Sequence, residues 1–271
     1  MAVGWFVLAN RGGGGGSSAA PVTGGDLHSL VADPADASRL FVGGHQAVAV
    51  STDGGKTWMQ VDSLENADAM GWAFMGDTVL VGGHPGLSVS TDGGRTFERR
   101  NRGLPATDIH ALGAGGGVVY AASPQVGVFA STDGGRTWDV RTPSGGQTFM
   151  GRILVDPDDP DHLVAPDMRS GVVESADGGR TWRSLGGMRG VMWVTWDPAD
   201  PAHLVAAGEG EWASSTDGGT TWTELVAPEG ASLVELDPSE ARILYAAIHD
   251  PRSGRVTIEV SRDGGQTWGR A

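Results

Sequence analysis

The octapeptide Ser131-Thr132-Asp133-Gly134-Gly135-Arg136-Thr137-Trp138 decides the fold, because the chain repeats it. Close copies occur five more times, with their aspartates at Asp53, Asp92, Asp177, Asp217 and Asp263. The intervals between successive aspartates are 39, 41, 44, 40 and 46 residues. A period of this length predicts a row of equivalent structural units.

Each copy of the octapeptide is expected to form a turn between two β-strands. Apolar residues alternate with others just before the third copy, in 127–130, and just after it, in 138–140, as they do in a hairpin. The aspartate can accept hydrogen bonds from its own turn, the paired glycines supply positive φ angles, and the closing aromatic packs back on the hairpin. The copies are therefore interpreted as structural, without a catalytic role.

The octapeptide resembles the Asp box, or BNR repeat, of sialidases, sortilin-like receptors and photosystem II assembly propellers. Six copies in one chain make the resemblance specific. It implies an all-β fold, a six-bladed β-propeller of four-stranded antiparallel blades that spans residues 27–271. It implies much less about activity, because the propeller scaffold carries many unrelated functions.

The third repeat illustrates the four strands expected in each blade. They are placed at 109–113, 118–122, 127–130 and 137–141. In four repeats the turn between the first two strands begins Asp-Pro, at Asp33-Pro34, Asp156-Pro157, Asp197-Pro198 and Asp237-Pro238. In a four-stranded meander the first strand begins on the face opposite the repeated turn, so functional residues are expected on that opposite face.

The first 26 residues lie outside the repeats. An apolar run at 2–9 is followed by Arg11 and five glycines. We interpret residues 1–26 as a partial signal-anchor and a Gly/Ser-rich linker, with a disordered leader as the alternative. The run is too short to span a bilayer by itself. The interpretation predicts an extracytoplasmic protein, either secreted or anchored to a membrane.

Charge and cysteine content exclude several classes of function. Nineteen basic residues against 33 acidic ones give a net charge of −14, which opposes phosphate backbones and anionic lipid surfaces. Nucleic acid is therefore not expected as a partner, and a membrane only through the N-terminal anchor. The chain has no cysteine, so disulfides and thiolate metal sites are excluded.

Histidine and methionine recur at two positions of the repeat. The start of the first strand carries His28, Met70, His110, Met192 and Ser232, with Met150 one residue out of register. The end of the second strand carries His45, His84, Pro124, Met168, Glu209 and His249. Cross-strand pairing would place the two positions side by side, for example His28 beside His45.

These two positions predict a metal site. Imidazole and thioether suit copper, particularly Cu(I), and a glutamate such as Glu209 could contribute to a Cu(II) or Zn(II) site. The expected ligands are His28, His45, Met70, His84, His110, Met150, Met168, Met192, Glu209 and His249. The alternative is that methionine fills an irregular channel mouth and histidine satisfies backbone groups there.

A second resemblance concerns the segments 68–72, 83–85 and 108–112. They resemble motifs of exported bacterial BNR-repeat proteins described as glycosyl hydrolase-like, and the match extends from Leu27 to about Leu112. A sialidase would need an arginine triad and a tyrosine nucleophile. Tyr120 and Tyr245 share the interior position of Phe41, so they do not fit the nucleophile.

Other polar residues leave the enzyme question open. Arg152, Arg169 and Arg189 are expected to reach the functional face, but three arginines alone do not cleave a bond. A paired-carboxylate glycosidase could draw on Asp68, Asp108, Asp167, Glu209 or Glu211. Asp26, Asp68 and Asp108 each lie two residues before the start of a first strand, where a loop-capping role is the simpler interpretation.

The sequence therefore predicts a non-enzymatic extracytoplasmic propeller that binds a soft metal ion, copper first, or a protein or glycan partner through a face lined by histidine and methionine. One alternative is a sialidase-like glycoside hydrolase. Another is an assembly-factor propeller that acts as a scaffold, for which Arg99, Arg100 and Arg102 are the basic residues available.

Overall fold

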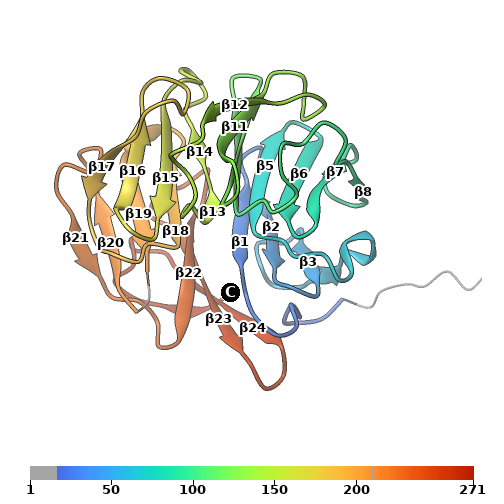
Figure 1. Ribbon diagram of the computed structural model, residues 1–271. Helices are drawn as coiled ribbons and strands as arrows, with labels where there is room; N and C mark the ends of the chain where they lie inside the picture. The colour runs from blue at the N-terminus through green and yellow to red at the C-terminus, as the bar shows by residue number, and fades with distance from the viewer. Residues whose placement is uncertain (1–16, 209) are drawn as a thin grey trace, which may run out of the picture.

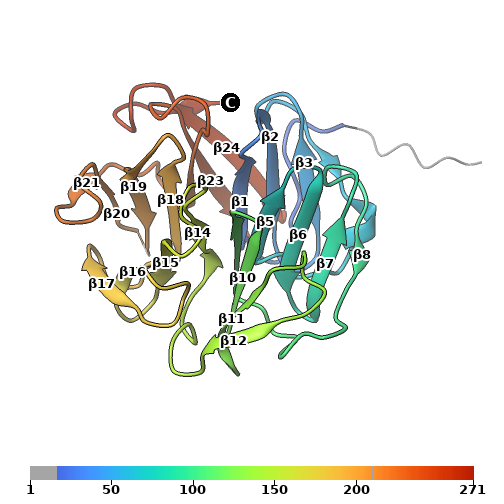
Figure 2. The same cartoon turned by 90° about the horizontal axis from the view of Figure 1, so that it is seen from above.

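The protein is a six-bladed β-propeller, as predicted, in the computed structural model, which describes residues 17–208 and 210–271. The apolar run at 2–9 lies outside the described residues. Figures 1 and 2 show the inner strands gathered around a central axis and the outer strands at the periphery. No helix among the described residues is long and apolar enough to cross a membrane.

The strands follow the chain order within each blade. The first blade contains β1 (Ser29–Asp33), β2 (Asp36–Gly43), β3 (Val48–Ser51) and β4 (Met59–Gln60), and the second contains β5 (Gly71–Met75), β6 (Thr78–Gly83), β7 (Gly86–Ser90) and β8 (Glu98–Arg99). A 3₁₀ turn at Asp62–Leu64 separates them. The third contains β9 (Ala111–Gly115), β10 (Val118–Ser123), β11 (Gly127–Ser131) and β12 (Asp139–Thr142).

The inner strand of the fourth blade is divided. Its first part, β13 (Gly151–Arg152), pairs in parallel with β9 of the third blade. The fourth sheet itself contains β14 (Leu154–Val155), β15 (Leu163–Asp167), β16 (Gly171–Ser175) and β17 (Arg183–Gly186). The fifth contains β18 (Trp193–Asp197), β19 (Asp200–Ala207), β20 (Trp212–Ser215) and β21 (Thr223–Leu225), and the sixth β22 (Ala231–Leu236), β23 (Leu244–Asp250), β24 (Arg255–Ser261) and β25 (Gly269–Arg270).

The third repeat forms the four strands predicted for it, with small shifts at the ends. The inner strand β9 begins two residues later than expected, and β12 begins at Asp139 rather than Thr137. The reason is local, because the turn uses Thr137 for its own hydrogen bonds. Asp133 Oδ1 accepts from the N–H groups of Arg136 and Thr137, each at 2.9 Å, and Oδ2 accepts from the Thr137 hydroxyl at 2.7 Å.

The paired glycines perform the predicted role in this turn. Gly134 and Gly135 have φ angles of 74° and 82°, the left-handed region that glycine adopts without strain. The repeated turn also contacts the start of the second strand of its blade, just after the turn between the first two strands, since the Gly54 N–H donates to the Ser38 carbonyl at 2.9 Å. Both kinds of turn therefore lie on one face, which we call the turn face. The opposite face, where the inner strands begin, is called the loop face.

Aromatic side chains fill the space between blades. Phe41 and Trp72, from the first two blades, are 0% and 1% exposed with ring centroids 4.9 Å apart. Tyr120 and Tyr245 are also buried, which confirms their predicted interior position. Burying such rings removes on the order of 150–250 Å² of surface each, so contact between blades supplies much of the stability.

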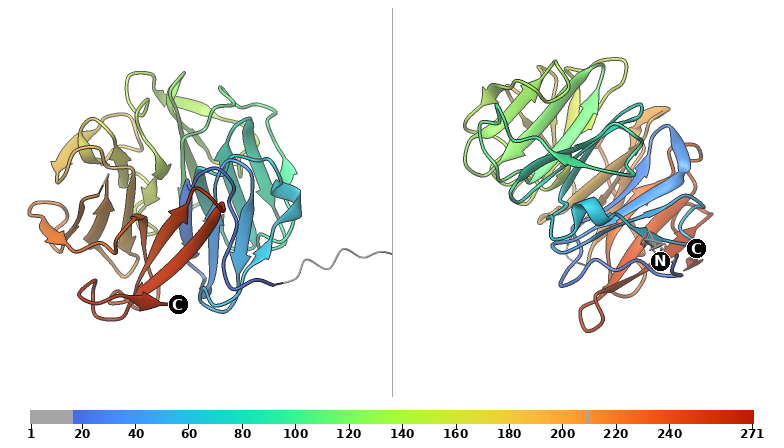
Figure 3. Two further views of the ribbon diagram at one scale, coloured as in Figure 1. Left: turned by 90° about the horizontal axis from the view of Figure 1, so that it is seen from below. Right: turned by 90° about the vertical axis from the view of Figure 1, so that its right-hand side faces the viewer.

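Residues 17–26 connect the first and last blades. Ser18 and Trp58, which precedes β4, exchange two backbone hydrogen bonds of 2.9 Å. On the other side the Thr23 N–H donates to Gly254 and the Val256 N–H to Pro21, both at 2.9 Å. Figure 3 shows the last blade, in red, beside the first, in blue. This part of the predicted linker is thus packed against the propeller, and it joins the two ends of the ring.

Candidate functional site

Four histidines predicted as ligands gather on the loop face in two pairs. His28, just before β1, and His45, just after β2, have ring centroids 4.3 Å apart, and Nε2 of the first lies 2.9 Å from Nδ1 of the second. His84 and His110, from the next two blades, have ring centroids 5.7 Å apart. The first pair is the cross-strand juxtaposition predicted within one blade, whereas the second is a contact between two adjacent blades.

Each pair of imidazoles shares an aspartate. Asp26 Oδ2 contacts Nδ1 of His45 and lies 3.3 Å from Nε2 of His28. In the second pair, Asp108 Oδ1 lies 2.7 Å from Nε2 of His84 and 2.8 Å from Nε2 of His110. The nitrogen and oxygen atoms within each group lie within 4.8 Å of one another, which is close enough for one metal ion to contact all three residues.

A third aspartate, Asp68, connects the two groups. Its Oδ1 lies 3.5 Å from Nε2 of His28, and its Oδ2 lies 2.9 Å from Nδ1 of His84. Its side chain is only 4% exposed. Asp68 can accept the Nδ1 proton of His84, an arrangement that would leave Nε2, which faces Asp108, free to bind a metal ion. We call the seven residues the Asp/His arc: Asp26, His28, His45, Asp68, His84, Asp108 and His110.

Two oxygen atoms of the arc are buried without a hydrogen bond: Oδ1 of Asp68 and Oδ1 of Asp108. This holds although the imidazole nitrogens of His84 and His110 lie within 2.8 Å of the Asp108 oxygen, because the atoms are not aligned for donation. A buried carboxylate oxygen without a donor costs free energy, on the order of 1–3 kcal/mol. A cation placed among the three atoms would satisfy all of them at once.

The protonation of His28 also suits a ligand role. Burial lowers the pKa of its imidazole, and the neighbouring Asp68 and Asp26 carboxylates offset only part of that effect. The neutral ring is the form that coordinates metals, so a lowered pKa reduces competition from protons.

The methionines occupy a different place from the arc. Met70, Met150 and Met192 line a cavity of about 50 Å³ at the axis of the loop face, together with His28. Five members of the first-strand position, including Met150 with its shifted register, thus line one cavity, and His110 does not. Only His28 belongs both to this cavity and to the arc.

The remaining predicted ligands are not part of either group. His249 donates from Nε2 to the Gly24 carbonyl at 3.0 Å, and so satisfies a backbone group of the N-terminal segment. Met168 is 45% exposed at the rim. Glu209 lies outside the described residues.

The aspartates of the arc were interpreted from sequence as loop caps. Asp26 does cap, because it accepts from the His45 N–H at 3.2 Å, but all three aspartates also face the imidazoles. The sequence contained a usable signal. Asp26-Leu27-His28 and Asp108-Ile109-His110 place an acid and an imidazole two residues apart, and such residues share one face of an extended chain.

The residues that a sialidase would need lie elsewhere. The hydroxyl groups of Tyr120 and Tyr245 donate to Pro160 and Asp237, each at 2.9 Å, in turns on the turn face. Arg152 was expected to reach the loop face, but it does not. Its guanidinium contacts the buried Glu235 and lines a cavity at the other end of the axis.

No protein-family model and no curated protein matches the sequence. Solved structures share the fold. A GH74 xyloglucanase from Xanthomonas campestris is 18% identical with a TM-score of 0.62, over 94% of this chain and 46% of the enzyme, so this chain spans less than half of that protein. YCF48 bound to a D1 peptide is 19% identical with a TM-score of 0.58, over 97% of this chain and 87% of YCF48.

A third neighbour comes from a nidogen/laminin complex, with 15% identity and a TM-score of 0.65 over 86% of this chain and 93% of the other. At these identities the likeness shows a shared propeller fold. The neighbours include both enzymes and proteins that bind other proteins, so the likeness by itself selects no activity.

Proposed function

We propose that this propeller binds divalent transition-metal ions on its loop face through the Asp/His arc. The observation that carries the proposal is the environment of Asp108 Oδ1, which is buried, lacks a hydrogen bond, and lies 2.7 Å and 2.8 Å from two imidazole nitrogens. A metal ion bound between these three atoms would satisfy the carboxylate oxygen and use both imidazoles as ligands.

The donor set favours Cu(II) or Zn(II) over Cu(I). Imidazole suits all three ions, whereas carboxylate oxygen suits the divalent ions and thioether sulfur suits Cu(I). In the arc the imidazoles are paired with aspartates, and the methionine cavity is separate apart from His28. Cu(II) stands above Zn(II) in the general order of affinity, so copper remains the first candidate, in its oxidised state.

Asp68 is proposed to orient a ligand rather than to bind the second ion directly. Its 2.9 Å contact with Nδ1 of His84 resembles the carboxylate–histidine–metal arrangement in which an outer acid sets the tautomer of the ligand. The two groups of three residues would then hold up to two ions per chain.

The wider setting of this function is also a proposal. The hydrogen bonds of the repeated turn support an Asp-box propeller, and the N-terminal sequence supports export to an extracytoplasmic location. YCF48 with its D1 peptide and the nidogen/laminin complex support a partner-binding role as the second candidate.

The test is metal content followed by titration. Protein purified without an affinity tag is analysed for bound metal, stripped with a chelator, and titrated with Cu(II) and Zn(II) by calorimetry. We expect up to two ions per chain. His84→Ala with His110→Ala should remove one site, and His28→Ala with His45→Ala the other.

His203 supplies the matched control, because it lies on β19 away from the arc, and His203→Ala should bind as the unmodified protein does. Affinity weaker than ~1 mM for both ions, or unchanged binding in both double variants, would exclude the proposed site.

A further inference from the structure

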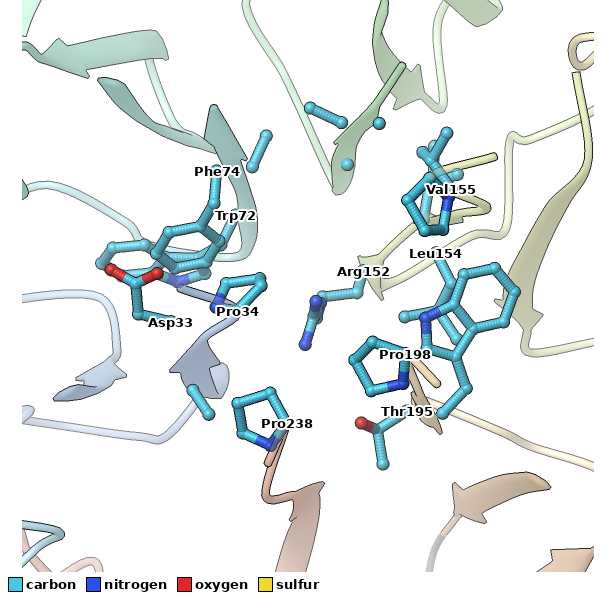
Figure 4. Close-up of a pocket in the computed structure, with 18 of the residues that line it drawn as sticks. Asp33, Pro34, Trp72, Phe74, Arg152, Leu154, Val155, Thr195, Pro198 and Pro238 are labelled. Atoms are coloured by element: carbon cyan, nitrogen blue, oxygen red, sulfur yellow. The ribbon is translucent and has the colours of Figure 1, made fainter. Parts of the chain in front are cut away.

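The turn face contains a larger cavity, of about 240 Å³, at the end of the axis opposite the arc. All six blades contribute to its lining. Four prolines from the Asp-Pro turns line it: Pro34, Pro157, Pro198 and Pro238. Figure 4 labels three of them, Pro34, Pro198 and Pro238. Because the proline ring fixes φ, these turns hold the opening in one shape. The metal proposal does not use this cavity or the Asp-Pro motif.

Arg152 is the functional group of the cavity. It carries the only positive charge among the described lining residues, and Figure 4 shows its guanidinium projecting into the space between Phe74 and Pro198. Among the described residues its side chain makes one hydrogen bond, to Oε1 of Glu235. A guanidinium has five N–H donors, so most of the donors are left for a molecule in the cavity.

Glu235 serves to hold Arg152 in place. It is 1% exposed, and it also accepts from the Ala32 N–H at 3.2 Å and from Nε1 of Trp193 at 3.3 Å. These partners fix the carboxylate in the wall, and the carboxylate in turn fixes one edge of the guanidinium. The other edge of Arg152 is presented in a defined orientation.

The second acid of the lining is occupied by its own turn. Asp33 Oδ2 lies 3.2 Å from the Arg39 guanidinium, and Oδ1 accepts from the Ala35 N–H at 2.9 Å. Asp33 is therefore not a partner for Arg152. The free edge of the Arg152 guanidinium therefore lacks a partner in the cavity wall, and a ligand with a planar acceptor group could supply one.

The rest of the wall is apolar and aromatic. Trp72 and Phe74 are stacked with ring centroids 6.4 Å apart, and Trp196 and Leu154 form part of the lining. Such surfaces favour a flat apolar body, because the face and edge of an aromatic ring contact other rings well. The volume suits a molecule of one or two rings rather than a polymer chain.

We propose that this cavity binds a small organic acid with an aromatic body, whose carboxylate takes the free edge of Arg152 and whose ring lies against Phe74 and Trp196. Arginine is suited to this task, because its planar donors match the two oxygens of a carboxylate. The site lies at the opposite end of the axis from the arc, so it does not depend on the metal proposal.

The test compares charged and neutral probes of the same shape. Phenylacetate, 3-phenylpropionate and indole-3-acetate are titrated against the full chain, with phenylacetamide, 3-phenylpropionamide and indole-3-acetamide as matched neutral molecules. Binding is followed by calorimetry and by tryptophan fluorescence, since Trp72 and Trp196 line the cavity. We expect at least one acid to bind with Kd below ~1 mM and its amide to bind at least ~10-fold more weakly. No binding by any acid, or equal binding of acid and amide, would overturn the proposal.

Two variants locate the binding. Arg152→Lys keeps the charge beside Glu235 but loses the planar donors, and it should weaken acid binding at least ~10-fold. Arg152→Gln combined with Glu235→Gln removes both charges at similar volume and should abolish acid binding. Metal titration of each variant is the control and should be unchanged. Affinity within ~2-fold of the unmodified protein in either folded variant would overturn the proposal, and Arg152→Lys decides the matter if the double variant does not fold.

Discussion

Replacing Asp108 by asparagine tests whether Asp108 is a metal ligand or a structural carboxylate, because the two roles predict opposite effects on stability. Without metal, Asp108 Oδ1 is buried and lacks a hydrogen bond. The amide of asparagine has the same shape and can donate to the lone pair of a neighbouring imidazole. We therefore expect metal-free Asp108→Asn to be as stable as the unmodified protein or more stable by about 1 kcal/mol, the usual net value of one hydrogen bond.

With metal bound, the unmodified protein should be the more stable of the two. A ligand present at 100 times its Kd stabilises a folded protein by about 2.7 kcal/mol. Loss of an outer partner of a metal ligand costs about 10–100-fold in affinity, so loss of a direct ligand should cost at least about 100-fold. At the same metal concentration the stabilisation then falls to about 0.4 kcal/mol. For a chain of this length each kcal/mol moves Tm by about 2–4 °C.

The assay is thermal unfolding at pH 8, where free imidazole is neutral, with and without Zn(II). It is performed in a variant that also carries His28→Ala and His45→Ala, so that only the site formed by His84, Asp108 and His110 responds to the metal. We expect a metal-induced rise in Tm of about 5–10 °C with Asp108 and about 1 °C with asparagine. Asp139→Asn, at an exposed position of β12, is the matched control. An unchanged rise in Asp108→Asn, or a metal-free variant less stable by more than about 1 kcal/mol, would refute the reasoning.

Three further predictions concern the scaffold and one concerns catalysis. Hydrogen bonds from the threonine hydroxyl and backbone lower the pKa of the turn aspartates from 3.8 to about 2 at Asp53 and Asp177, so their contribution to stability is present above pH 3.8 and is lost as the pH falls through about 2. Acid titration followed by circular dichroism should place unfolding in that window, and unfolding centred above pH 5 would contradict it. Glu235→Ala should cost about 3–5 kcal/mol in urea unfolding because it leaves the Arg152 charge uncompensated, whereas Glu240→Ala, at an exposed ion pair, should cost less than about 1 kcal/mol. Deletion of residues 1–25 should raise hydrogen exchange in β24 and around Trp58, which the N-terminal segment bridges, and unchanged exchange there would show that the segment does not help to close the ring. A panel of aryl glycosides, including a sialoside, should show no turnover above background, because both tyrosines are buried on the turn face, and hydrolysis that depends on Asp68 would instead favour the glycosidase.

Much of the architecture could be predicted because its causes are local. The aspartate, glycines and threonine of each turn interact within eight residues, so the period of that phrase is enough to count the blades and to mark the hairpins. The buried tyrosines could be predicted for a related reason, since aligned repeats place Tyr120 and Tyr245 at the interior position of Phe41.

The candidate site could be predicted only in part. Aligned repeats identify His28, His45, His84 and His110, because equivalent positions of adjacent blades are neighbours. They do not say which neighbours make contact. Asp68 was assigned to its own loop, yet it lies between imidazoles from two blades, and His249 was assigned to the ligands although it donates to Gly24.

What the sequence determined by itself is the repeated unit: six hairpin turns, each complete within its own residues, and the strand pattern between them. Only the tertiary structure decided the direction of the side chains at the two ends of the axis. Arg152 lines the cavity of the turn face, where Glu235, 83 residues away in the chain, accepts its hydrogen bond. The distance from Asp108 to His84 likewise depends on how two blades pack. Such contacts join residues far apart in sequence, and no local pattern encodes them.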